Sequence, residues 1–477
     1  MSRTPTDTPI RYHLLGIGGT AMASLAGLLE QLGHEVQGSD GPIYPPMSDV
    51  LADLGATVFE GYDAANLDPA PDMLVVGNAI PRGNPELEAA LDRDLPYASM
   101  PALLSRVLLQ DRTRLVVSGT HGKTTTTAMA ASLLHAAGKG AGWLVGGLPL
   151  GLPANHHIGR PGQPFVIEGD EYDTAYFDKA AKFFHYRPHR LVVGGVEFDH
   201  ADIYADLDAI ELQFRRLVNI VPRTGRVIAC ADDAAAMRVT ERPHCDRLTF
   251  GVGPRKGGAP EPDFWAPETA SNDGGIEFEL RIRGGDRGLW RIAMPGAFNV
   301  RNALAALALT EGLGLSDDDT RAALAAFRGV RRRLELRGER RGIRVYDDFA
   351  HHPTAIAGAI EAITDVTEGR VIAVLEPRSW TLRRRVFESE LAGALARAEV
   401  AVVAPVYRPE KLSQDVLMNP DRVVSMLARR GREAHAPDST DEIVSLVLRI
   451  AEPGDSVLIM SNGGFDGIYT RLLDGLN

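Results

Sequence analysis

The segment Gly119-Thr-His-Gly-Lys-Thr124 places a glycine-rich loop between a strand and a helix. The apolar run RLVVS comes before it, and a helical stretch rich in Thr and Ala follows it. Loops of this kind present backbone N–H groups at a helix N-terminus and bind phosphates there. We expect Lys123 to hold the β- and γ-phosphates of a nucleotide and the Thr124 hydroxyl to ligate Mg²⁺. Val117 stands where the standard motif has glycine, so the loop is a shortened relative, and a glycine turn with an incidental lysine is the alternative.

Short β-branched runs alternate with longer helical patterns over most of the chain, which predicts a parallel α/β architecture. The 477 residues are too many for a single core and indicate about three domains. We expect these domains to span residues 1–108, 109–328 and 329–477. The Lys256–Asn272 region is rich in Gly and Pro, so we expect a loop or insertion there.

The net charge of -12 argues against nucleic acid as a partner, because binding to phosphate backbones needs a basic surface. The two cysteines, Cys230 and Cys245, fit a reducing compartment and rule out a disulfide scaffold. The polar N-terminal stretch does not resemble a signal peptide, and no apolar run reaches the ~18 residues of a membrane span. We therefore expect a cytoplasmic protein that acts on something small or soluble, without a membrane partner.

A second glycine loop, Gly16-Ile-Gly-Gly-Thr-Ala21, also follows a strand and opens a helix. Its glycines would let the backbone approach a diphosphate, and Asp40 at the end of the next strand would reach a ribose hydroxyl. Alone, this motif suits a nicotinamide or flavin enzyme, or a tight turn that binds nothing. Two glycine loops together imply two phosphorylated ligands. A dehydrogenase needs only the first loop and a plain ATPase only the second, whereas an ATP-driven ligase with a nucleotide-linked substrate needs both.

An acidic run, FVIEGDEYDTAYFDK (165–179), follows the P-loop lysine by about 45 residues, at the end of another strand. Ligands collect at the carboxyl ends of strands in α/β sheets, so we expect Glu168 to face the Mg²⁺ and phosphates. The later acids are expected on the turn. His200, in VEFDHAD, is predicted to end the following strand and to be a second metal ligand. A structural histidine is the alternative.

Three further groups of polar residues are candidates for the site. Asn299 and Asn302 lie three apart and share one face of a predicted helix, where they suit a nucleotide or metal-bound water, or an N-terminal cap. The segment 347–353, DDFAHHP, closes a strand with two carboxylates and two imidazoles. The basic run 331–333 precedes it and could neutralise phosphate charge, although such runs are also commonly solvated.

Taken in order, GIGGTA, GTHGKTT, EGDEYD, EFDHAD, FNVRNA, VRRRL and DDFAHHP resemble the Mur ligase family over essentially the whole chain. The resemblance implies a three-domain α/β architecture with a Rossmann-like UDP-binding domain, a central P-loop ATPase domain and a Rossmann-like C-terminal domain that brings in the amine. It implies an ATP-dependent amide ligase that works through an acyl phosphate, with ATP and Mg²⁺, or Mn²⁺, as cofactors.

The resemblance also implies roles for individual residues. The implied catalytic residues are Lys123, Glu168, His200, Arg333 and Asp348. The implied metal ligands are Thr124, Glu168 and His200. The implied nucleotide contacts are Gly119, Thr120, His121, Gly122, Lys123, Thr124, Thr125, Asn299, Asn302, Arg333, Asp348, His351 and His352. The implied contacts to the UDP-sugar are Gly18, Gly19, Thr20, Ser39, Asp40 and Asn78.

Within the family, EGDEYDTAYFDKAAKF, DDFAHHPTAI, VLEPRS and SNGGFDG look like the branch that joins UDP-N-acetylmuramate to L-alanyl-γ-D-glutamyl-meso-diaminopimelate in peptidoglycan recycling. Trp380, Leu382 and Asp466 depart from that branch's usual residues, in the domain expected to bind the amine. The alternatives are the branch that adds L-alanine to UDP-N-acetylmuramate and a non-catalytic UDP-sugar or ATP sensor.

A peptide with several carboxylates needs cationic partners, and arginine forks suit carboxylates. The residues expected to supply them are Arg378, Arg383, Arg408 and Lys411. The expected partners are thus UDP-N-acetylmuramate and a murein tripeptide, bound by a monomer or a weak homodimer.

Overall fold

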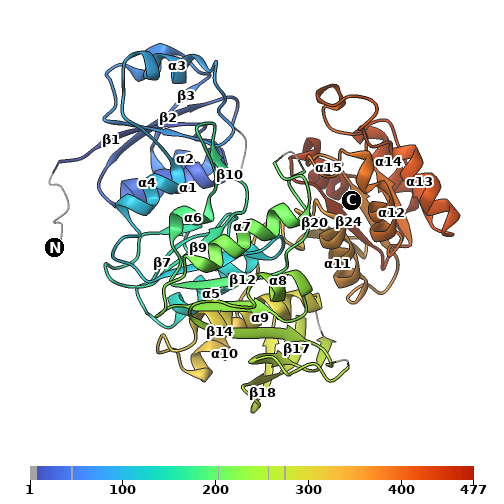
Figure 1. Cartoon of the computed structure of the whole chain (residues 1–477). Helices are drawn as coiled ribbons and strands as arrows, with labels where there is room; N and C mark the ends of the chain where they lie inside the picture. The colour runs from blue at the N-terminus through green and yellow to red at the C-terminus, as the bar shows by residue number, and fades with distance from the viewer. Residues whose placement is uncertain (1–7, 44–46, 202, 256, 273–274, 477) are drawn as a thin grey trace. The chain divides into compact units, whose positions relative to one another are not determined.

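The computed structural model describes residues 8–43, 47–201, 203–255, 257–272 and 275–476 (Figure 1). Within these ranges, no helix is both long and apolar enough to cross a membrane. The chain divides into two compact units, each built from several segments. The first unit comprises Met1–Val196, Ile210–Thr249 and Ala306–Thr320, and the second comprises Glu197–Ala209, Phe250–Ala305 and Arg321–Asn477.

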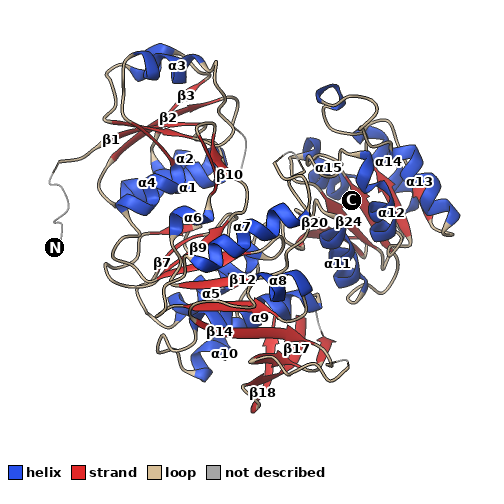
Figure 2. Ribbon diagram, in the orientation of Figure 1, coloured by secondary structure: helices blue, strands red, loops and turns tan. Residues whose placement is uncertain are grey.

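The first unit begins with a parallel five-stranded sheet in the order β3-β2-β1-β4-β5 (Figure 2). Its strands are β1 (Arg11–Leu15), β2 (Glu35–Asp40), β3 (Thr57–Glu60), β4 (Met73–Val76) and β5 (Tyr97–Ser99). Its helices are α1 (Thr20–Gln31), α2 (Met47–Leu54), α3 (Pro85–Asp92) and α4 (Met100–Val107). Because β1 is central and both its neighbours run parallel to it, the loop after β1 opens at the carboxyl edge of the sheet, as the sequence predicts.

The same unit contains part of a second sheet, with the strand order β13-β12-β6-β9-β7-β8. These strands are β6 (Arg114–Ser118), β7 (Gly142–Leu144), β8 (His156–His157), β9 (Phe165–Gly169), β12 (Arg190–Val193) and β13 (Arg226–Cys230). All are parallel to their neighbours except β8, which pairs antiparallel to β7. The neighbours of β6 are β12 and β9, so residues that end these three strands meet at one edge of the sheet. The helices of this part are α5 (Lys123–Ala136), α6 (Phe183–Tyr186) and α8 (Ala234–Val239), and the hairpin is β10 (Asp173–Ala175) with β11 (Asp178–Ala181).

Four elements run from one unit into the other, namely α7 (Leu207–Asn219), β14 (Asp246–Val252), α9 (Ala297–Thr310) and α10 (Asp317–Ala325). In the second unit, the order β16-β17-β15-β14 continues from β14, and β18 pairs with β17. These strands are β15 (Phe264–Ala266), β16 (Thr269–Asn272), β17 (Gly275–Ile282) and β18 (Gly285–Ile292).

The expected loop at Lys256–Asn272 is therefore wrong for its second half, while Lys256 itself lies outside the described residues. Phe264 and Trp265 are buried, and both β15 and β16 pair antiparallel with β17. The apolar burial and the pairing with β17 override the local Gly and Pro content.

The second unit ends with a six-stranded sheet in the order β19-β20-β24-β21-β22-β23, parallel except for β19. Its strands are β19 (Glu335–Arg340), β20 (Ile343–Asp348), β21 (Val371–Leu375), β22 (Val400–Val403), β23 (Glu433–His435) and β24 (Ser456–Met460). Alternate residues of β21 enter different cores: Val371, Ala373 and Leu375 pack with α11 (Pro353–Thr364), α12 (Glu388–Leu395) and α13 (Pro420–Arg429). Ile372 and Val374 pack on the other face with α14 (Thr440–Ile450) and α15 (Ile468–Gly475). A parallel sheet covered on both faces is the Rossmann-like arrangement that the sequence predicts.

Within the first unit, the short strand β8 packs against helix α1. The side-chain amide of Asn155 donates to the Ser24 hydroxyl at 2.7 Å, and a Cβ on Gly27 would overlap the imidazole ring of His156. His156 is buried, and its Nδ1 lies 3.0 Å from Asn155 Oδ1. Gly27 is required here because the imidazole occupies the space of a larger side chain.

The burial of His156 predicts a pH-dependent stability. Burial, with neighbouring His157 adding to it, lowers the pKa of His156 from 6.5 to about 4. The unfolded chain thus binds more protons than the folded chain between these two values, so the free energy of unfolding falls as the pH drops through this window, by about 3 kcal/mol in total. In the His156→Asn variant, the loss of thermal stability between pH 7 and pH 4.5 should be smaller than in wild type, as followed by circular dichroism. Equal losses in the two proteins would contradict this assignment.

Candidate active site

The glycine loop after β6 has the geometry of a phosphate-binding loop. Gly119 has a φ of 128°, and a Cβ there would lie 3.0 Å from the backbone of Gly194, so only glycine fits. Gly122, at a φ of 77°, is the N-cap of α5 and has no side chain with which to cap the helix. The N-terminus of α5 thus presents its amide groups and its positive dipole end at the carboxyl edge of the sheet, which suits a phosphate.

Lys123, the first residue of α5, has a buried ammonium group with three acceptors. Its Nζ donates to the Gly119 carbonyl at 2.7 Å and to the two carboxylate oxygens of Glu171 at 2.9 and 3.1 Å. Burial alone would lower the pKa of Lys123, but Glu171 and Asp170 outweigh this effect and the net pKa is raised. The lysine is therefore a fixed cation at the phosphate-binding loop.

Glu168 lies beside Thr124, as the sequence predicts. It belongs to β9, opposite Val117 of β6, and one carboxylate oxygen accepts the Thr124 hydroxyl at 3.0 Å. The other accepts the Gly146 amide. Burial, with Asp170 adding to it, raises the pKa of Glu168 to about 7. A hydroxyl and a carboxylate next to a phosphate-binding loop are the oxygen donors that Mg²⁺ prefers, so these residues fit such an ion.

The other acids of the EGDEYD run have different partners. Asp170 pairs with Lys182 at 3.4 Å, and Asp173 pairs with the exposed Lys179 at 2.6 Å. Glu171 lies on the bend after β9, where the sequence predicts it, but it is buried against Lys123. Sequence reasoning missed this pairing. The only signal for it is that the run has more carboxylates than one metal ion needs.

The glycine loop after β1 is held by the end of β2. The Gly18 amide donates to Asp40 Oδ2 at 2.8 Å, and the Gly16 amide donates to the Ser39 carbonyl at 2.8 Å. Asp40 Oδ1 also accepts the Gly41 amide at 2.7 Å and the Tyr62 hydroxyl at 3.1 Å. Asp40 therefore shapes the loop, and a ribose hydroxyl would share the carboxylate with these donors. Gly19 is the N-cap of α1, whose first residue is Thr20.

The Ser39 side chain does not face a ligand, and a contact of Ser39 with the UDP-sugar stays a prediction. Ser39 is fully buried, and its hydroxyl donates to Glu86 Oε2 at 2.5 Å. Glu86 Oε1 lies 2.8 Å from His13 Nε2, and both of these side chains are also fully buried. Because its hydroxyl lies against buried His13 and Glu86, the Ser39 side chain faces the interior. Asn78, by contrast, is exposed two residues after the end of β4.

In the second unit, Asp348 ends β20 and is held by two backbone amides. The Leu334 amide donates to Oδ2 at 2.8 Å, and the Ala350 amide donates to Oδ1 at 2.7 Å. Burial raises the pKa of Asp348 to about 6, against the opposing effect of Arg333. The Arg333 guanidinium lies 5.0 Å from the centre of the Phe349 ring. These two predicted residues thus lie close together.

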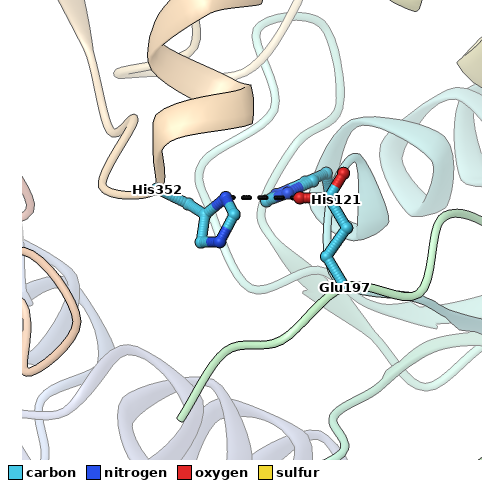
Figure 3. A group of neighbouring side chains, drawn as sticks. All are labelled: His121, Glu197 and His352. Atoms are coloured by element: carbon cyan, nitrogen blue, oxygen red, sulfur yellow. Dashed lines mark ion pairs between the residues drawn. The ribbon is translucent and has the colours of Figure 1, made fainter. Parts of the chain in front are cut away.

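His352 and Glu197 also lie together in the second unit (Figure 3). The imidazole caps α11 by accepting the Thr354 amide at 3.3 Å, and its Nδ1 lies 3.4 Å from Glu197 Oε2. The Thr354 hydroxyl donates to the same Glu197 oxygen at 2.6 Å. His351 Nδ1 lies 2.9 Å from the Phe349 carbonyl. His352 is therefore part of a helix cap, and a nucleotide contact by either histidine stays a prediction.

The predicted position of His200 at the end of a strand is wrong. β12 ends at Val193, and His200 lies in the following loop with a φ of 53°. The preceding residue, Asp199, is buried and accepts the Thr381 hydroxyl at 2.5 Å. Burial would raise the pKa of Asp199, but His200 and Thr381 overcome this effect and hold the pKa at about 2. The glycines after Val193 end the strand.

Asn299 and Asn302 lie in the first turns of α9 and bond to each other. The Asn299 side-chain amide donates to the Pro295 carbonyl at 2.7 Å, and its Oδ1 accepts the Asn302 side-chain amide at 3.1 Å. Asn299 is fully buried. The prediction that they share a helix face is confirmed, and the bonds of Asn299 favour the alternative of a structural role at the helix start.

The four cationic residues predicted to bind a peptide have different surroundings. Arg383 is buried and donates to the carbonyls of Tyr407 and Arg408 at 3.2 and 3.3 Å, which favours support of the 407–411 loop over direct contact with a ligand. Arg378 stacks on the Tyr407 ring at 3.7 Å. Arg408 and Lys411 are exposed at the same loop. Trp380 is exposed and lies under the Arg383 guanidinium, whereas Leu382 is buried.

Asp466 has a left-handed backbone conformation, with a φ of 48°. A residue with a Cβ is strained there, so Asp466→Gly should raise the free energy of unfolding by up to about 1 kcal/mol. The Thr440 hydroxyl donates to Asp466 at 2.8 Å, and this exposed bond would be lost. Thr440→Val is the control, because it removes the bond alone. Thermal midpoints of the variants and wild type test this prediction, and a lower midpoint for Asp466→Gly would contradict it.

Three family models match successive parts of the chain. They are the Mur ligase family catalytic domain at residues 11–112, the Mur ligase middle domain at 117–310 and the Mur ligase glutamate ligase domain at 332–463. These three domains follow one another along the chain in the order that the resemblance implies.

Two curated relatives and one solved structure are similar over nearly the full length. The UDP-N-acetylmuramate–L-alanyl-γ-D-glutamyl-meso-2,6-diaminoheptandioate ligase of Escherichia coli (strain K12) is 42% identical, over 98% of each chain. The UDP-N-acetylmuramate–L-alanine ligase of Cereibacter sphaeroides (strain ATCC 17025) is 34% identical, over 94% of this chain and 93% of that protein. The crystal structure of a murein peptide ligase from Psychrobacter arcticus 273-4 is 38% identical over 98% of each chain, with a TM-score of 0.73. The chain belongs to the Mur ligase family.

Proposed function

We propose that this chain is an ATP-dependent ligase that joins the carboxylate of UDP-N-acetylmuramate to the amine of L-alanyl-γ-D-glutamyl-meso-diaminopimelate. The observation that carries the proposal is the phosphate-binding loop in which Lys123 is held as a cation beside Thr124 and Glu168. A reaction between two anions, a carboxylate and ATP, needs this positive charge. We further propose that the enzyme works in the cytoplasm.

The proposed reaction has two steps. A carboxylate oxygen of UDP-N-acetylmuramate attacks the γ-phosphorus of ATP, which gives an acyl phosphate and releases ADP. The peptide amine then attacks the acyl carbon, inorganic phosphate leaves, and the amine loses a proton. Lys123 and Arg333 stabilise the negative charge on the transferred phosphoryl group. Thr124 and Glu168 would hold Mg²⁺, which supplies further positive charge at the phosphates, and His200 is the proposed second metal ligand.

The proposed substrate site begins at the glycine loop after β1, where Gly18, Gly19 and Thr20 lie at the N-terminus of α1. Such a terminus suits the diphosphate of the UDP-sugar. For the acceptor, identity is higher to the tripeptide ligase of E. coli than to the L-alanine ligase of C. sphaeroides, 42% against 34%. The exposed cations Arg408 and Lys411 and the stacked Arg378 suit the carboxylates of a peptide better than free alanine, which has one carboxylate.

Acceptor-dependent phosphate release tests the proposal. Purified protein with UDP-N-acetylmuramate, ATP and Mg²⁺ is supplied with L-alanine or with the di-, tri- or tetrapeptide, and phosphate and ADP are measured. We expect the highest kcat/KM with the tripeptide. Preference for L-alanine would place the chain in the alanine-adding branch. If the folded protein binds UDP-sugar or ATP but releases no ADP in response to any acceptor, it is a sensor.

The 407–411 loop, which carries Arg408 and Lys411, gives a second test of which acceptor the enzyme uses. Replacing Arg408 and Lys411 together by alanine should raise the KM for the tripeptide roughly tenfold, since two exposed charge pairs contribute up to about 1 kcal/mol each, and should leave the KM for ATP unchanged. Replacing the exposed Arg429 and Arg449 on α13 and α14 by alanine is the control, because it removes the same charge elsewhere. Equal tripeptide KM values in the two double variants would argue against this loop as the peptide site.

A further inference from the structure

The contact between Lys123 and Glu171 has a consequence for nucleotide binding. A lysine ammonium has three N–H donors. In this structure they have three protein acceptors, the Gly119 carbonyl and the two Glu171 oxygens, within 3.1 Å. Glu171 comes from the bend after β9, 48 residues from the lysine in sequence. A phosphate that binds Lys123 must therefore replace or share acceptors that already surround the ammonium group.

Glu171 is placed differently from the neighbouring carboxylates. Glu168 accepts the Thr124 hydroxyl and the Gly146 amide, and Asp170 pairs with Lys182. The Glu171 side chain is 2% exposed and that of Lys123 13% exposed, so the pair is formed away from bulk water. The Coulomb attraction in such an environment is larger than at the surface but is offset by the cost of desolvation, and losing one partner leaves an uncompensated buried charge.

We propose that Glu171 is a positioning residue that holds Lys123 in the phosphate-binding loop before nucleotide arrives and competes with the nucleotide phosphates for the ammonium group. This inference rests on the proposed role of Lys123 in ATP binding. The carboxylate keeps the lysine extended along the loop, and a phosphate then takes over the ammonium as its anionic partner. The affinity for ATP is lower than it would be if Lys123 had no carboxylate partner, because ATP binding breaks or weakens the buried Lys123–Glu171 ion pair.

Removing the charge of Glu171 should strengthen the binding of ATP. In Glu171→Gln the side chain keeps its length and one acceptor oxygen but loses its charge. Without nucleotide, the buried Lys123 then lacks the negative charge that Glu171 supplied. A bound phosphate provides that negative charge instead. We expect Glu171→Gln to bind a non-hydrolysable ATP analogue roughly tenfold more tightly than wild type. Glu171→Asp keeps the charge but withdraws the carboxylate, and should tighten binding by roughly threefold.

Isothermal titration calorimetry with the ATP analogue and Mg²⁺ measures these affinities. Asp173→Asn is the matched control, because it removes one carboxylate of the same segment whose partner is the exposed Lys179. We expect its affinity to stay within roughly twofold of wild type. Unchanged or weaker binding by both Glu171 variants would overturn the proposal, and so would equal tightening in the Asp173→Asn control.

Two further measurements separate this proposal from simpler explanations. Thermal midpoints with and without the analogue should show a lower unliganded midpoint for Glu171→Gln and a larger rise on binding, whereas a purely structural role would lower both midpoints equally. Glu171→Asp carries the test if Glu171→Gln does not fold. Wild type and Lys123→Met are titrated alongside, and equal affinities of these two proteins would instead show that the proposed ATP-binding role of Lys123 is wrong.

Discussion

Replacing Lys123 by methionine is expected to lower kcat/KM by roughly 10³-fold or more. Methionine keeps the length of the side chain but removes the cation that is proposed to face the transferred phosphoryl group. Loss of a preorganised charge at a developing negative charge costs about 4 kcal/mol or more, which corresponds to this factor. Steady-state ADP release at saturating UDP-N-acetylmuramate and tripeptide measures the effect.

The control for this variant is Lys179→Met, because Lys179 is exposed on the β10–β11 hairpin and pairs with Asp173. Lys123→Met also leaves the buried Glu171 without its cation, so the thermal midpoint of this variant must be shown to lie well above the assay temperature. A folded Lys123→Met protein with kcat/KM within tenfold of wild type would show that the loop is not the catalytic ATP site.

Glu168→Gln is expected to lower kcat by roughly 10²- to 10³-fold, with partial recovery at high Mg²⁺ concentration. The amide oxygen can still accept the Gly146 amide, so the fold of this edge should persist. The amide lacks the negative charge that a divalent cation prefers in an oxygen ligand, and weaker metal binding reduces the stabilisation of the phosphoryl group.

A titration of kcat against Mg²⁺ at saturating ATP distinguishes this role from a structural one. Glu168→Gln should need a higher Mg²⁺ concentration for half-maximal activity, whereas Asp173→Asn should follow the wild-type curve. If Glu168→Gln lost activity without any change in its Mg²⁺ dependence, Glu168 would act on the fold and not on the metal.

Local patterns predicted those parts of the fold that depend on neighbouring residues. Asp40 ends β2, as its pattern predicts, and both glycine loops join a strand to a helix. Gly119 and Gly122 could be identified because both have positive φ values, and a close backbone approach at Gly119 also demands glycine. The three-domain α/β architecture followed from such units and from the order of the motifs.

Contacts between distant segments could not be predicted in this way. The pairing of Glu171 with Lys123 depends on the adjacency of β6 and β9, which sequence spacing does not reveal. Ser39 follows a glycine and precedes an acid, a pattern typical of a ligand loop, yet its side chain faces a buried histidine and glutamate. β15 was missed because its three residues are too short to show a period.

The buried group His13, Ser39 and Glu86 constrains how this protein can change. Replacing any one member would leave its partners buried without their bonds, at a cost of about 3–5 kcal/mol where a charge is left unpaired. Replacing all three by apolar side chains of matching shape could be nearly neutral. The effects of single substitutions at these positions should therefore be strongly non-additive. Along a path of single substitutions the three positions are expected to be epistatic, so that each residue is preserved by the presence of the other two.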